Sequence, residues 1–591
     1  MEQVILKEKS EHFLKKNIYT GDIESYLDDN NEWVFKIGNV YNGYTHTTFN
    51  NVLDFFEYVS SRNQIKFVYF HNLDFDLLFF LKFLDNSYID NVEILRSGNT
   101  IISAKFKDIT FINSFMLFPM SLKSIVKDFL VVEDKDWLND KSNVLSLKYD
   151  VLIKYCRKDC YYLYNALAKF FNEVSQYYDK KFLTISSLTL NIFTRNFLNN
   201  ENIFLDENRN ILSEKEYYYG GHTEKFINEV YRFKGLKYYD VNSLYPDCMR
   251  FCKVGVGKSK FIKNSLKSLK WLKQNDKVFL ASVRLNIINE DDRIFFSRID
   301  GENRNKLLFG EHDYIISEVS FDYIIKYEIE ILKVYRVNYY EGYEYIFKEF
   351  IEKFYAYRDI SKFHKSVYKM LLNYLYGKFG QREETKKVFI NPNNFLEFDY
   401  IVDNGSHILC EKDDTLHFSK IKYLRKDIAG KITELARIKM SEYRKEIKKN
   451  GGEVFYQDTD SIITNIELDE KFVDSKKLGY MKLENKQGDL NGYIIGAKLY
   501  YLTNGKETFK AHKGVKNMTQ FNFINLVLNC ELKNIKWSDD RSSFTFNYCG
   551  NFPNRGFYLE RFSKPKMYFN KNFFGIYKIP FNYFNITQRL D

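Results

Sequence analysis

The stretch YQDTDSII, residues 456–463, places Asp458 and Asp460 one residue apart and directly before an apolar run. It follows a Gly-Gly pair and two apolar residues, a pattern that predicts a tight hairpin with the acids at its tip. Residues two apart on an extended segment point to the same face, so the two carboxylates are expected to converge on one cation. Mg²⁺ prefers such hard oxygen ligands and leaves other positions for phosphate oxygens and water. An isolated acidic turn is more often a solvated hairpin tip, so this interpretation depends on a second acidic site.

Asp240 provides that second site, because it ends an aromatic segment and is followed by a turn closed by Pro246. The strings DVNSLYP, residues 240–246, and YQDTDS resemble the two carboxylate motifs of family B DNA polymerases, in the chain order of that family. The form DVNSLYP also resembles the protein-primed branch, found in linear phages, linear plasmids and mitochondrial plasmids. The resemblance implies two Mg²⁺ ions, with Mn²⁺ as a substitute, held by Asp240, Asp460 and the carbonyl of Val241 and supported by Asp458. It also implies that Tyr245 lies under the incoming sugar and excludes ribose.

A separate set of acids precedes residue 188. Asp22 and Glu24 alternate on one expected strand, Asp76 follows the apolar strand 67–70, and Asp159 lies one helical turn after Tyr155. Four acids from three elements suit a two-metal hydrolytic site, although any single acid is more often a surface residue. The strings DIE, NLDFD and YCRKD resemble the three motifs of the 3′-5′ proofreading exonuclease domain of the same polymerases, which has an RNase H-like fold. That resemblance gives metal binding to Asp22, Glu24, Asp76 and Asp159, orientation of the attacking water to Tyr155, and contact with the primer end to Asn72, Phe75, Ser121 and Leu122.

Residues 346–381 contain no Pro and no Gly before Gly377, which predicts helix. At 3.6 residues per turn one stripe carries Arg358, Lys362, Lys365, Lys369, Asn373 and Tyr376. Four cations on one stripe repel one another, which favours a bound triphosphate; a wet helix face is the alternative. The end of the stripe, KMLLNYLYG, resembles the nucleotide-binding finger motif of family B, with Tyr374 in place of the usual Ser. The resemblance implies dNTP binding by this stripe and by Tyr245, and charge neutralisation on the leaving phosphates by Lys369.

Two shorter motifs extend the resemblance. Tyr218, Gly220 and Gly221 resemble the YxGG element that joins the two domains of protein-primed enzymes and contacts DNA, with a plain hairpin turn as the alternative. Lys498 and Tyr500 in GAKLYYL resemble the KxY element that binds the primer strand, and alternation places both on one strand face.

Bulk composition allows several domains, because the chain has 591 residues of which 45% are hydrophobic. The net charge of +10 fits a polyanionic partner, but an ordinary basic enzyme would also show it. No stretch approaches the roughly 20 apolar residues that cross a bilayer, and the charged start lacks an apolar signal core, so we expect a soluble intracellular protein without a membrane partner. The many Phe, Asn, Lys and Ile residues suggest an AT-rich source, hence a mitochondrial location if a plasmid or organelle encodes the chain, and otherwise the host cytoplasm.

We therefore expect an α+β multidomain protein with an RNase H-like 3′-5′ exonuclease domain, residues 1–188, and a right-hand polymerase domain, residues 189–591. The expected parts of the second domain are the palm (189–255 and 426–500), a first insertion (256–345), the fingers (346–381), a second insertion (384–425) and the thumb (501–591). The first insertion lies where protein-primed enzymes carry an insertion that docks the terminal protein and the DNA. It begins with the basic run 258–274, for which a solvated helix face is equally compatible. The second insertion matches in location a hairpin that encircles DNA, and the thumb interleaves cations with aromatic residues, as phosphate-gripping segments do.

The expected function is DNA-directed DNA synthesis with proofreading, which replicates a linear element by protein-primed initiation and strand displacement. The expected partners of this monomer are a DNA primer-template, dNTPs and a terminal protein. Within enzymes the alternatives are a polymerase primed by nucleic acid and an exonuclease with an inactive polymerase half. A nucleic-acid-binding scaffold without catalysis would require neither the two acid sets nor the basic stripe.

Overall fold

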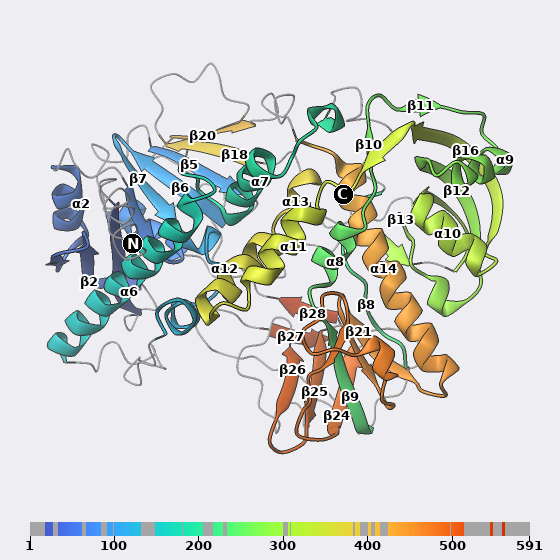
Figure 1. Cartoon of the computed structure of the whole chain (residues 1–591). Helices are drawn as coiled ribbons and strands as arrows, with labels where there is room; N and C mark the ends of the chain where they lie inside the picture. Colours follow the sequence, from blue (N-terminus) through green and yellow to red (C-terminus); the bar gives the residue numbers. More distant parts are fainter. Residues whose placement is uncertain are drawn as a thin grey trace.

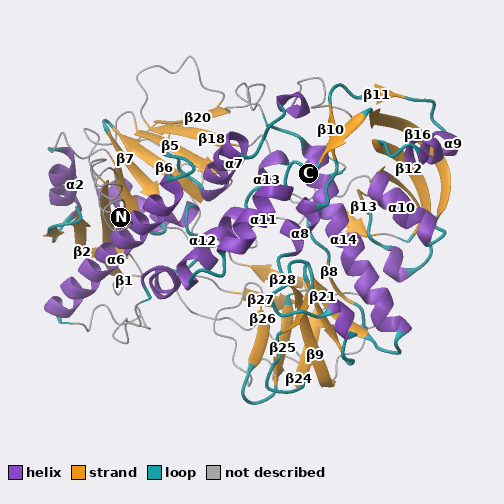
Figure 2. Ribbon diagram, in the orientation of Figure 1, coloured by secondary structure: helices purple, strands orange, loops and turns teal. Residues whose placement is uncertain are grey.

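The computed structural model describes residues 18–27, 33–61, 67–83, 92–97, 100–131, 148–180, 182–204, 217–227, 233–298, 305–307, 309–381, 385–390, 400–403, 408–413, 423–496, 498–512, 544–547 and 558–561. Three main sheets occupy different parts of the molecule and are joined by a central group of helices (Figure 1). Strands dominate the three outer parts, whereas helices fill the middle (Figure 2).

The N-terminal sheet is built around parallel pairing of β4 (Phe67–Phe70) with β1 (Ile18–Leu27) and β7 (Ile109–Asn113). Helices α2 (Val52–Ser60) and α3 (Leu73–Phe83) bury a cluster of aromatic side chains against one face. The 27-residue helix α6 (Tyr149–Ser175) packs on the opposite face through its own apolar stripe. The remaining strands and short helices here are β2 (Trp33–Tyr41), β3 (His46–Phe49), β5 (Val92–Ser97), β6 (Thr100–Phe106), η1 (Ser114–Met116), α5 (Leu122–Ile125) and η2 (Val126–Leu130).

Three strands from the expected second insertion complete this sheet. β18 (Thr385–Ile390) pairs antiparallel with β5, so that Ile390 lies opposite Val92. β20 (Ile408–Asp413) follows β18, and β19 (Tyr400–Asp403) forms the edge of the ten-stranded order β19-β20-β18-β5-β6-β7-β4-β1-β2-β3. A segment distant in sequence is thus joined to the N-terminal sheet by backbone hydrogen bonds.

The central sheet holds both acidic motifs of the second half of the chain. β9 (Phe233–Val241) pairs with β22 (Ser461–Thr464), and β22 pairs with β21 (Val454–Asp458), as the hairpin pattern predicts. The full order is β26-β25-β24-β9-β22-β21-β8, and β23 also pairs with β9. The other members are β8 (Thr223–Lys225), β23 (Met481–Leu483), β24 (Leu490–Gly496), β25 (Leu499–Thr503) and β26 (Thr508–His512).

The expected first insertion forms its own four-stranded antiparallel sheet, β11-β16-β12-β15, with an apolar core. Helix α9 (Leu266–Gln274) lies within the basic run and buries Leu269 and Leu272 in that core, while its lysines are exposed. The other elements are β10 (Val254–Val256), β11 (Lys260–Phe261), β12 (Val278–Ile287), η7 (Glu290–Asp292), β13 (Phe296–Arg298), β14 (Asn305–Leu307), β15 (Gly310–Ser317), α10 (Glu318–Lys326), β16 (Glu330–Tyr340) and β17 (Gly342–Glu344).

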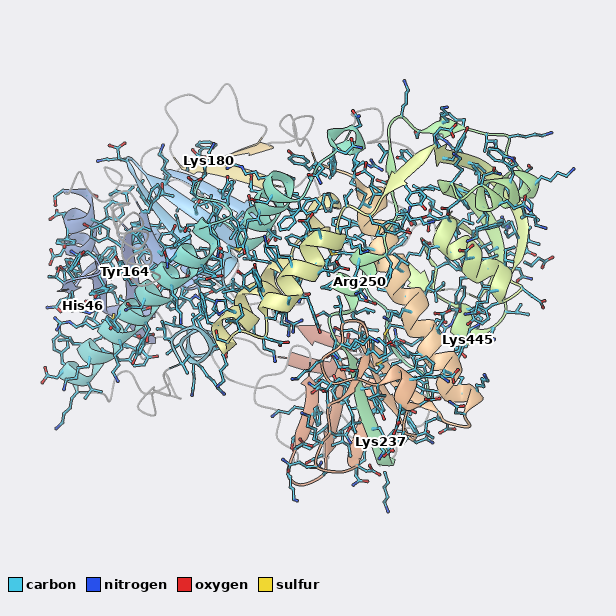
Figure 3. All side chains as sticks on the ribbon, viewed as in Figure 1. His46, Tyr164, Lys180, Lys237, Arg250 and Lys445 are labelled. Atoms are coloured by element: carbon cyan, nitrogen blue, oxygen red, sulfur yellow. The ribbon has the colours of Figure 1, made fainter. Side chains whose placement is uncertain are left out.

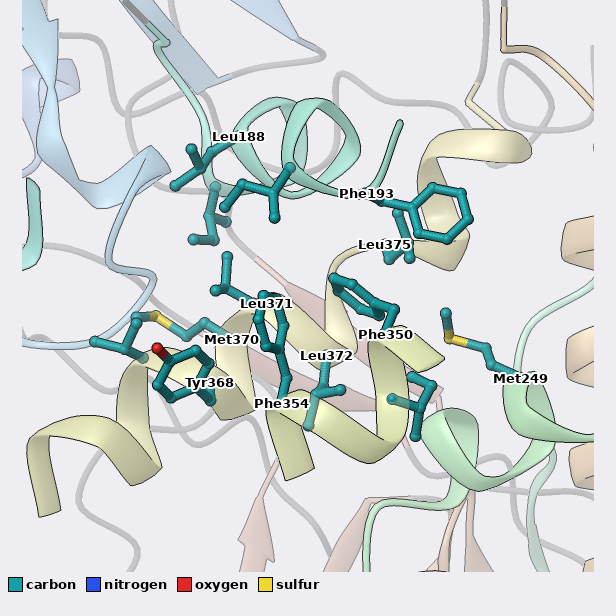
Figure 4. Close-up of a cluster of buried hydrophobic side chains, with 14 of the residues drawn as sticks. Leu188, Phe193, Met249, Phe350, Phe354, Tyr368, Met370, Leu371, Leu372 and Leu375 are labelled. Atoms are coloured by element: carbon teal, nitrogen blue, oxygen red, sulfur yellow. The ribbon is translucent and has the colours of Figure 1, made fainter. Parts of the chain in front are cut away.

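The expected boundary at 188/189 falls inside helix α7 (Ile185–Asn196). Leu188 and Phe193 of α7 point into the same apolar cluster as side chains of the central helices (Figure 4). The Phe193 ring is stacked on Phe347, with centroids 5.3 Å apart. Thr184 caps α7, so the break between elements precedes residue 185.

The expectation of one continuous cationic stripe through residues 346–381 is wrong. α11 (Lys348–Tyr357) ends at Arg358, and α12 (Lys362–Asn373) begins after Ser361, whose hydroxyl accepts a hydrogen bond from the His364 amide. This cap starts a new helix where the absence of Pro and Gly suggested continuity. Arg358 therefore does not share a helix face with Lys365 and Lys369.

The remaining elements are α8 (Leu244–Arg250), α13 (Tyr376–Phe379), α14 (Lys426–Lys449), η4 (Glu201–Phe204), η9 (Glu470–Phe472), β27 (Phe544–Asn547) and β28 (Tyr558–Arg561). Side chains of α14 and β9 reach their neighbours through ion pairs, including Lys445 to Asp292 at 2.5 Å and Lys237 to Asp489 at 2.5 Å. Figure 3 labels these two lysines among all the described side chains. Most of the expected thumb lies outside the described residues, and so do most residues of the second insertion. In the described part of the chain, every helix is too short or too polar to cross a membrane.

Candidate active sites

Three carboxylates converge on the N-terminal sheet. Asp22 and Glu24 lie on β1, and α6 carries Asp159 across that strand, where the Thr20 hydroxyl donates to the Cys160 carbonyl at 2.7 Å. One carboxylate oxygen from each acid lies within 4.8 Å of the other two. Three hard oxygen donors this close, on a strand and a rigid helix, suit a divalent cation.

Asp76 and Tyr155 lie nearby in the fold but differ in their relation to this group. Asp76, near the start of α3, is 5% exposed and is not part of the set of carboxylates within 4.8 Å. Tyr155 is buried on α6, one turn before Asp159, as its spacing predicts. The strand period places Asp22 and Glu24 on one face and the helix period places Tyr155 with Asp159, whereas the distances of Asp159 and Asp76 from β1 depend on how α6 and α3 lie on the sheet.

The residues expected to hold a primer end occupy two turns. Asn72 is exposed, has a left-handed backbone with φ 79°, and its carbonyl accepts a hydrogen bond from the Phe75 amide at 3.1 Å. Ser121 is the N-cap of α5, where its hydroxyl accepts from the Ser124 amide at 3.2 Å, and Leu122 is the first residue of that helix. Capping gives Ser121 a structural role besides the expected contact.

The second acidic site is assembled by strand pairing. Asp240 on β9 lies opposite Ser461 on β22 and opposite Lys482 on β23. The Val241 amide donates to the Asp460 carbonyl at 2.8 Å, which fixes the turn bearing Asp460 against the end of β9. Two acids far apart in sequence are therefore held side by side.

The pKa shifts of these two acids indicate that they share a site with a lysine from α12. Burial, followed by the charges of Asp460 and Glu484, raises the pKa of Asp240 to about 7. Burial also raises the pKa of Asp460, and the nearby charge of Asp458 adds to this rise. Lys369 opposes both pKa rises, so its ammonium lies within electrostatic reach of both carboxylates.

The alternation argument for Asp458 and Asp460 does not hold. β21 ends at Asp458, Thr459 has a left-handed φ of 59°, and Asp460 lies in the turn. The Asp458 carboxylate instead accepts hydrogen bonds from Lys498 Nζ at 2.6 and 2.8 Å and from the Thr223 hydroxyl at 2.8 Å. Asp458 therefore has a protein cation as its partner in this structure.

Alternation is also wrong for Lys498 and Tyr500. Lys498 precedes β25 and has a left-handed φ of 56°, so the two residues are not on one face of a strand. The Lys498 amide donates to the Tyr456 hydroxyl at 2.8 Å, and the Tyr500 ring is buried 5.3 Å from the Tyr456 ring. Lys498 is thus anchored to the acidic hairpin by both its backbone and its side chain.

The expected nucleotide-binding residues divide into two groups. Lys365, Lys369 and Asn373 belong to α12, with both lysines exposed. Arg358, after α11, donates to the Ser243 hydroxyl at 2.7 Å and so contacts the turn that follows Asp240. The break in the helix thus gives Arg358 a partner on the central sheet side of the site.

Two tyrosines from different motifs form an aromatic pair. The rings of Tyr245 on α8 and Tyr376 on α13 are stacked, with centroids 4.6 Å apart and an interplanar angle of 29°. Burial raises the pKa of Tyr245 to about 12, and Asp460 contributes to the raised pKa of both phenols. Both hydroxyls therefore stay protonated at neutral pH beside the acidic site.

The glycines of the expected YxGG element pack against protein. A Cβ on Gly221 would lie 2.6 Å from Thr459 Cγ2, and the Thr459 amide donates to the His222 carbonyl at 2.8 Å. The Gly220 carbonyl accepts from Arg437 at 3.1 Å, and a Cβ on Gly380 would meet the Tyr218 ring at 2.4 Å. Close approach to the acidic hairpin is therefore one reason for Gly221, beside the phosphate contact that the sequence suggested.

Several residues of this site carried no recognisable signal in the sequence. Lys482 and Glu484 lie on or just after β23 and affect the pKa of Asp240. Thr223 contacts Asp458, and Arg444 donates to the Gln457 side chain at 2.5 Å. Their types are common in any sequence, and only the strand order brings them to the acids.

Comparison with known families identifies a matching group. Residues 131–450, more than half of the chain, match the family described as DNA polymerase type B, organellar and viral.

Relatives agree with this match. A probable DNA polymerase of Podospora anserina is 29% identical over 381 residues, covering 56% of this chain and 29% of the relative. A probable DNA polymerase of Neurospora intermedia is 29% identical over 420 residues, covering 64% of this chain and 41% of the relative. The DNA-directed DNA polymerase of Enterobacteria phage PRD1 is 25% identical over 516 residues, covering 82% of this chain and 81% of the relative. This chain thus spans less than half the length of the first two relatives.

Solved structures show the same fold. Phi29 DNA polymerase complexed with primer-template DNA and incoming nucleotides has a TM-score of 0.63 and 18% identity, covering 92% of this chain and 98% of that one. The orthorhombic crystal form of Phi29 DNA polymerase has a TM-score of 0.64, covering 93% of this chain and 99% of that one. The expected fold class, an α+β multidomain protein, is confirmed, and the chain has the fold of Phi29 DNA polymerase.

The raised pKa of Asp240 predicts a pH-dependent effect of Asp240→Asn on stability in metal-free buffer. In the unfolded chain this acid ionises near its ordinary value, whereas in the fold it stays protonated up to about pH 7. Stability is therefore lost as pH rises through this window, and Asn removes the loss. Above pH 7 the variant should be more stable than the wild type, by on the order of 2 kcal/mol after allowance for screening, with no advantage near pH 4.

Thermal melts in EDTA from pH 4 to 8 measure this difference. A constant difference between the two proteins across the range would contradict an ionisation opposed by burial and by Asp460.

Proposed function

Because the chain belongs to the organellar and viral type B DNA polymerases, we propose that it is a DNA-directed DNA polymerase with a 3′-5′ proofreading exonuclease. Its partners are a DNA primer-template and dNTPs, and it acts as a monomer. The observation that carries the proposal is the convergence of Asp240, Asp460 and Lys369 from three separate segments. A binding scaffold would gain nothing from two crowded carboxylates whose repulsion costs stability.

At the polymerase site the donor set fits divalent cations. Asp240, Asp460 and the Val241 carbonyl would hold two Mg²⁺, or Mn²⁺, with Asp458 supporting the second carboxylate. When bound, the ions lower the barrier to attack by a 3′ hydroxyl on the α-phosphate. The raised pKa of both acids favours this use, because a cation relieves the repulsion that burial makes costly.

The surrounding residues bind and orient the nucleotide. Lys369 neutralises negative charge that develops on the leaving phosphates, and Lys365, Asn373 and Arg358 contribute to dNTP binding. The stacked pair of Tyr245 and Tyr376 supports the sugar and base, and Tyr245 excludes ribose by a clash with its 2′ hydroxyl. Tyr374, at the C-terminal end of α12, takes the position of the usual Ser and is half-buried.

Residues around the hairpin bind the DNA. Lys498 and Tyr500 contact the primer strand, and Tyr218, Gly220 and Gly221 contact DNA between the two sites. The ion pair of Lys498 with Asp458 holds that cation at the acidic hairpin, where the primer terminus must lie for the reaction. The Arg437 side chain donates a hydrogen bond to the Gly220 carbonyl, and the exposed Gly220 remains available to a phosphate.

At the exonuclease site Asp22, Glu24 and Asp159 would hold divalent ions, and Asp76 would add a ligand. The ions would supply an activated water for cleavage of the 3′ terminal phosphodiester. Tyr155 orients that water from the helix that carries Asp159. The frayed strand is held by Asn72 and Phe75, and by Ser121 and Leu122 at the start of α5.

Synthesis begins on a protein hydroxyl, we further propose, and proceeds by strand displacement on a linear DNA element. DVNSLYP, the YYGG segment and the two insertions support this assignment. The first insertion forms a folded unit whose α9 presents a row of exposed lysines, as a docking surface for a terminal protein requires. A linear DNA element in a mitochondrion, a plasmid-bearing host or a phage fits the amino-acid composition, which is typical of an AT-rich coding sequence.

The two chemistries should be separable. Asp22→Ala with Glu24→Ala should reduce 3′ trimming by about a hundredfold or more, because two of three close carboxylates are lost. Primer extension should change by less than about twofold, because Asp240, Asp460 and Lys369 remain in place.

Labelled primed DNA with and without dNTPs measures both activities, and Asp108→Ala, at an exposed turn of the same sheet, is the control. A folded variant that loses both activities together would refute two independent sites.

Lys369→Ala should lower kcat by about tenfold or more and also weaken dNTP affinity, because the lost contact strengthens as phosphate charge develops. Lys369→Arg keeps the charge and should retain much of the activity. Lys348→Ala removes an exposed cation from the neighbouring helix α11 and should behave as the wild type. Single-nucleotide incorporation kinetics test this. If Lys369→Ala has the kinetics of the wild type, the exposed cations of α12 are only a solvated helix face.

Charge reversal on α9 and just before it tests protein priming. Because Leu269 and Leu272 are buried, removal of the whole basic run would damage the fold, whereas exposed Lys263, Lys267 and Lys270 can be changed to Glu. Transfer of labelled dNMP to the candidate priming protein should fall by about tenfold or more, with elongation of an annealed primer nearly unchanged. The same three positions changed to Arg keep the charge and serve as the control. If no candidate protein accepts a nucleotide while DNA primers are extended, the protein-primed assignment fails and the polymerase assignment stands.

A further inference from the structure

The helix that carries Lys369 is attached to the N-terminal unit by a polar contact. Tyr368, the residue before Lys369, is 1% exposed, and its hydroxyl donates to Glu173 Oε1 at 2.5 Å. Glu173 lies near the C-terminal end of α6, the helix that bears Tyr155 and Asp159. Neighbouring positions on a helix project in different directions, so Tyr368 faces α6 while Lys369 remains exposed.

Further contacts surround this hydrogen bond. Glu173 Oε2 lies 3.7 Å from His364 Nε2, one turn earlier on α12, and the Tyr177 hydroxyl lies 3.4 Å from the Tyr368 hydroxyl. The Ser366 hydroxyl donates to Asp128 at 3.1 Å. The N-terminal unit thus contacts α12 at successive turns with directional groups.

Apolar packing and the hydrogen bond constrain α12 in different ways. The Tyr368 ring centroid lies 5.0 Å from that of Phe354 and 5.4 Å from that of Tyr357, and Figure 4 shows the Tyr368 and Phe354 side chains in this apolar cluster. Apolar contacts are non-directional, whereas a hydrogen bond to a carboxylate also restricts the distance and angle between its two groups. The hydrogen bond to Glu173 therefore adds a directional constraint on α12 next to Lys369.

We propose that Glu173 is a positioning residue for nucleotide incorporation, which acts through Tyr368 to hold Lys369 opposite Asp240 and Asp460. The inference rests on the proposed role of Lys369 with the dNTP. It makes α6 the common support of both sites: Asp159 serves hydrolysis, and Glu173, about 20 Å further along the helix, serves synthesis.

The alternative is that the pair only stabilises the fold. Loss of a purely stabilising contact would lower the melting temperature and affect both activities alike. Loss of a positioning contact would change the dNTP kinetics, leave trimming of single-stranded DNA unaltered, and cause no further loss once Lys369 is absent.

The test compares Tyr368→Phe, which keeps the ring and removes the hydroxyl, with Glu173→Ala and Glu173→Gln. Glu352→Gln, an exposed acid on α11, is the matched control. Incorporation kinetics are measured in the Asp22→Ala, Glu24→Ala background so that trimming does not interfere, and trimming of a single-stranded oligonucleotide is measured in the otherwise wild-type protein. Melting temperatures are recorded for every variant.

Tyr368→Phe and Glu173→Ala should each lower kcat/KM for dNTP by about three- to tenfold, with a smaller effect for Glu173→Gln, whose amide oxygen still accepts the hydrogen bond. Added to Lys369→Ala, Tyr368→Phe should cause no further loss, since it acts through that lysine. Trimming should stay within about twofold of wild type.

Three results would overturn the proposal. If Lys369→Ala impairs incorporation but Tyr368→Phe and Glu173→Ala do not, Glu173 is no positioning residue and the proposed function stands. If losses from Tyr368→Phe and Lys369→Ala are additive and trimming falls with the melting temperature, the contact is only structural. If Lys369→Ala itself has no effect, the failure lies in the proposed nucleotide site, and the positioning inference falls with it.

Discussion

The antiparallel pairing of β9 with β22 is the constraint on which the central site depends. It sets Asp240 opposite Ser461, and the hydrogen bond from the Val241 amide to the Asp460 carbonyl fixes the adjoining turn. Two carboxylates are thereby held together in a partly buried place, at an electrostatic cost that appears as a raised pKa of each. The strands are held by backbone hydrogen bonds on both sides, so this repulsion does not open the site. It leaves a position that favours cations, with Lys369 contributing positive charge from α12.

Helix α14 supports this arrangement with buried arginines that donate hydrogen bonds to neighbouring segments. Arg444 is inaccessible to solvent and donates both to Gln457, next to Asp458, and to the Asp291 carbonyl of the first insertion at 3.1 Å. Arg437 donates to the Ile294 carbonyl at 2.7 Å and to the Gly220 carbonyl. Buried guanidinium groups are tolerable when hydrogen bonds satisfy them, and removal of a partner would leave a costly charge. The position of the acidic hairpin is therefore linked to the first insertion and to the Gly220 segment.

The N-terminal unit is joined to the rest of the molecule through more than a linker. α7 packs into the central helical cluster, β18 extends the N-terminal sheet from a distant part of the chain, and α6 contacts α12 through Glu173. Such an arrangement places Asp22, Glu24 and Asp159 and the helix that carries Lys369 on one connected framework.

The sequence by itself determined which residues are candidates for the chemistry. The strings around Asp240 and Asp460, the alternation of Asp22 and Glu24, and the one-turn spacing of Tyr155 and Asp159 are local, and local periods of two and 3.6 residues survive in any fold that contains those elements. The hairpin at 454–464 and the fold class followed from the same patterns and the family resemblance.

Tertiary structure alone decided the partners. Asp458 and Lys498 depart from alternation because each lies at or beside a residue with a left-handed backbone, which periodicity does not register. The helix break at Ser361 depends on a cap, and the contact of Arg358 with Ser243 depends on where that break directs the chain. Pairing or packing between distant segments also decides three further placements. Asp76 lies outside the close carboxylates, Lys482 lies beside Asp240, and Glu173 contacts Tyr368. Local sequence patterns do not define such distances, because they are fixed only when strands pair and helices pack on a common core.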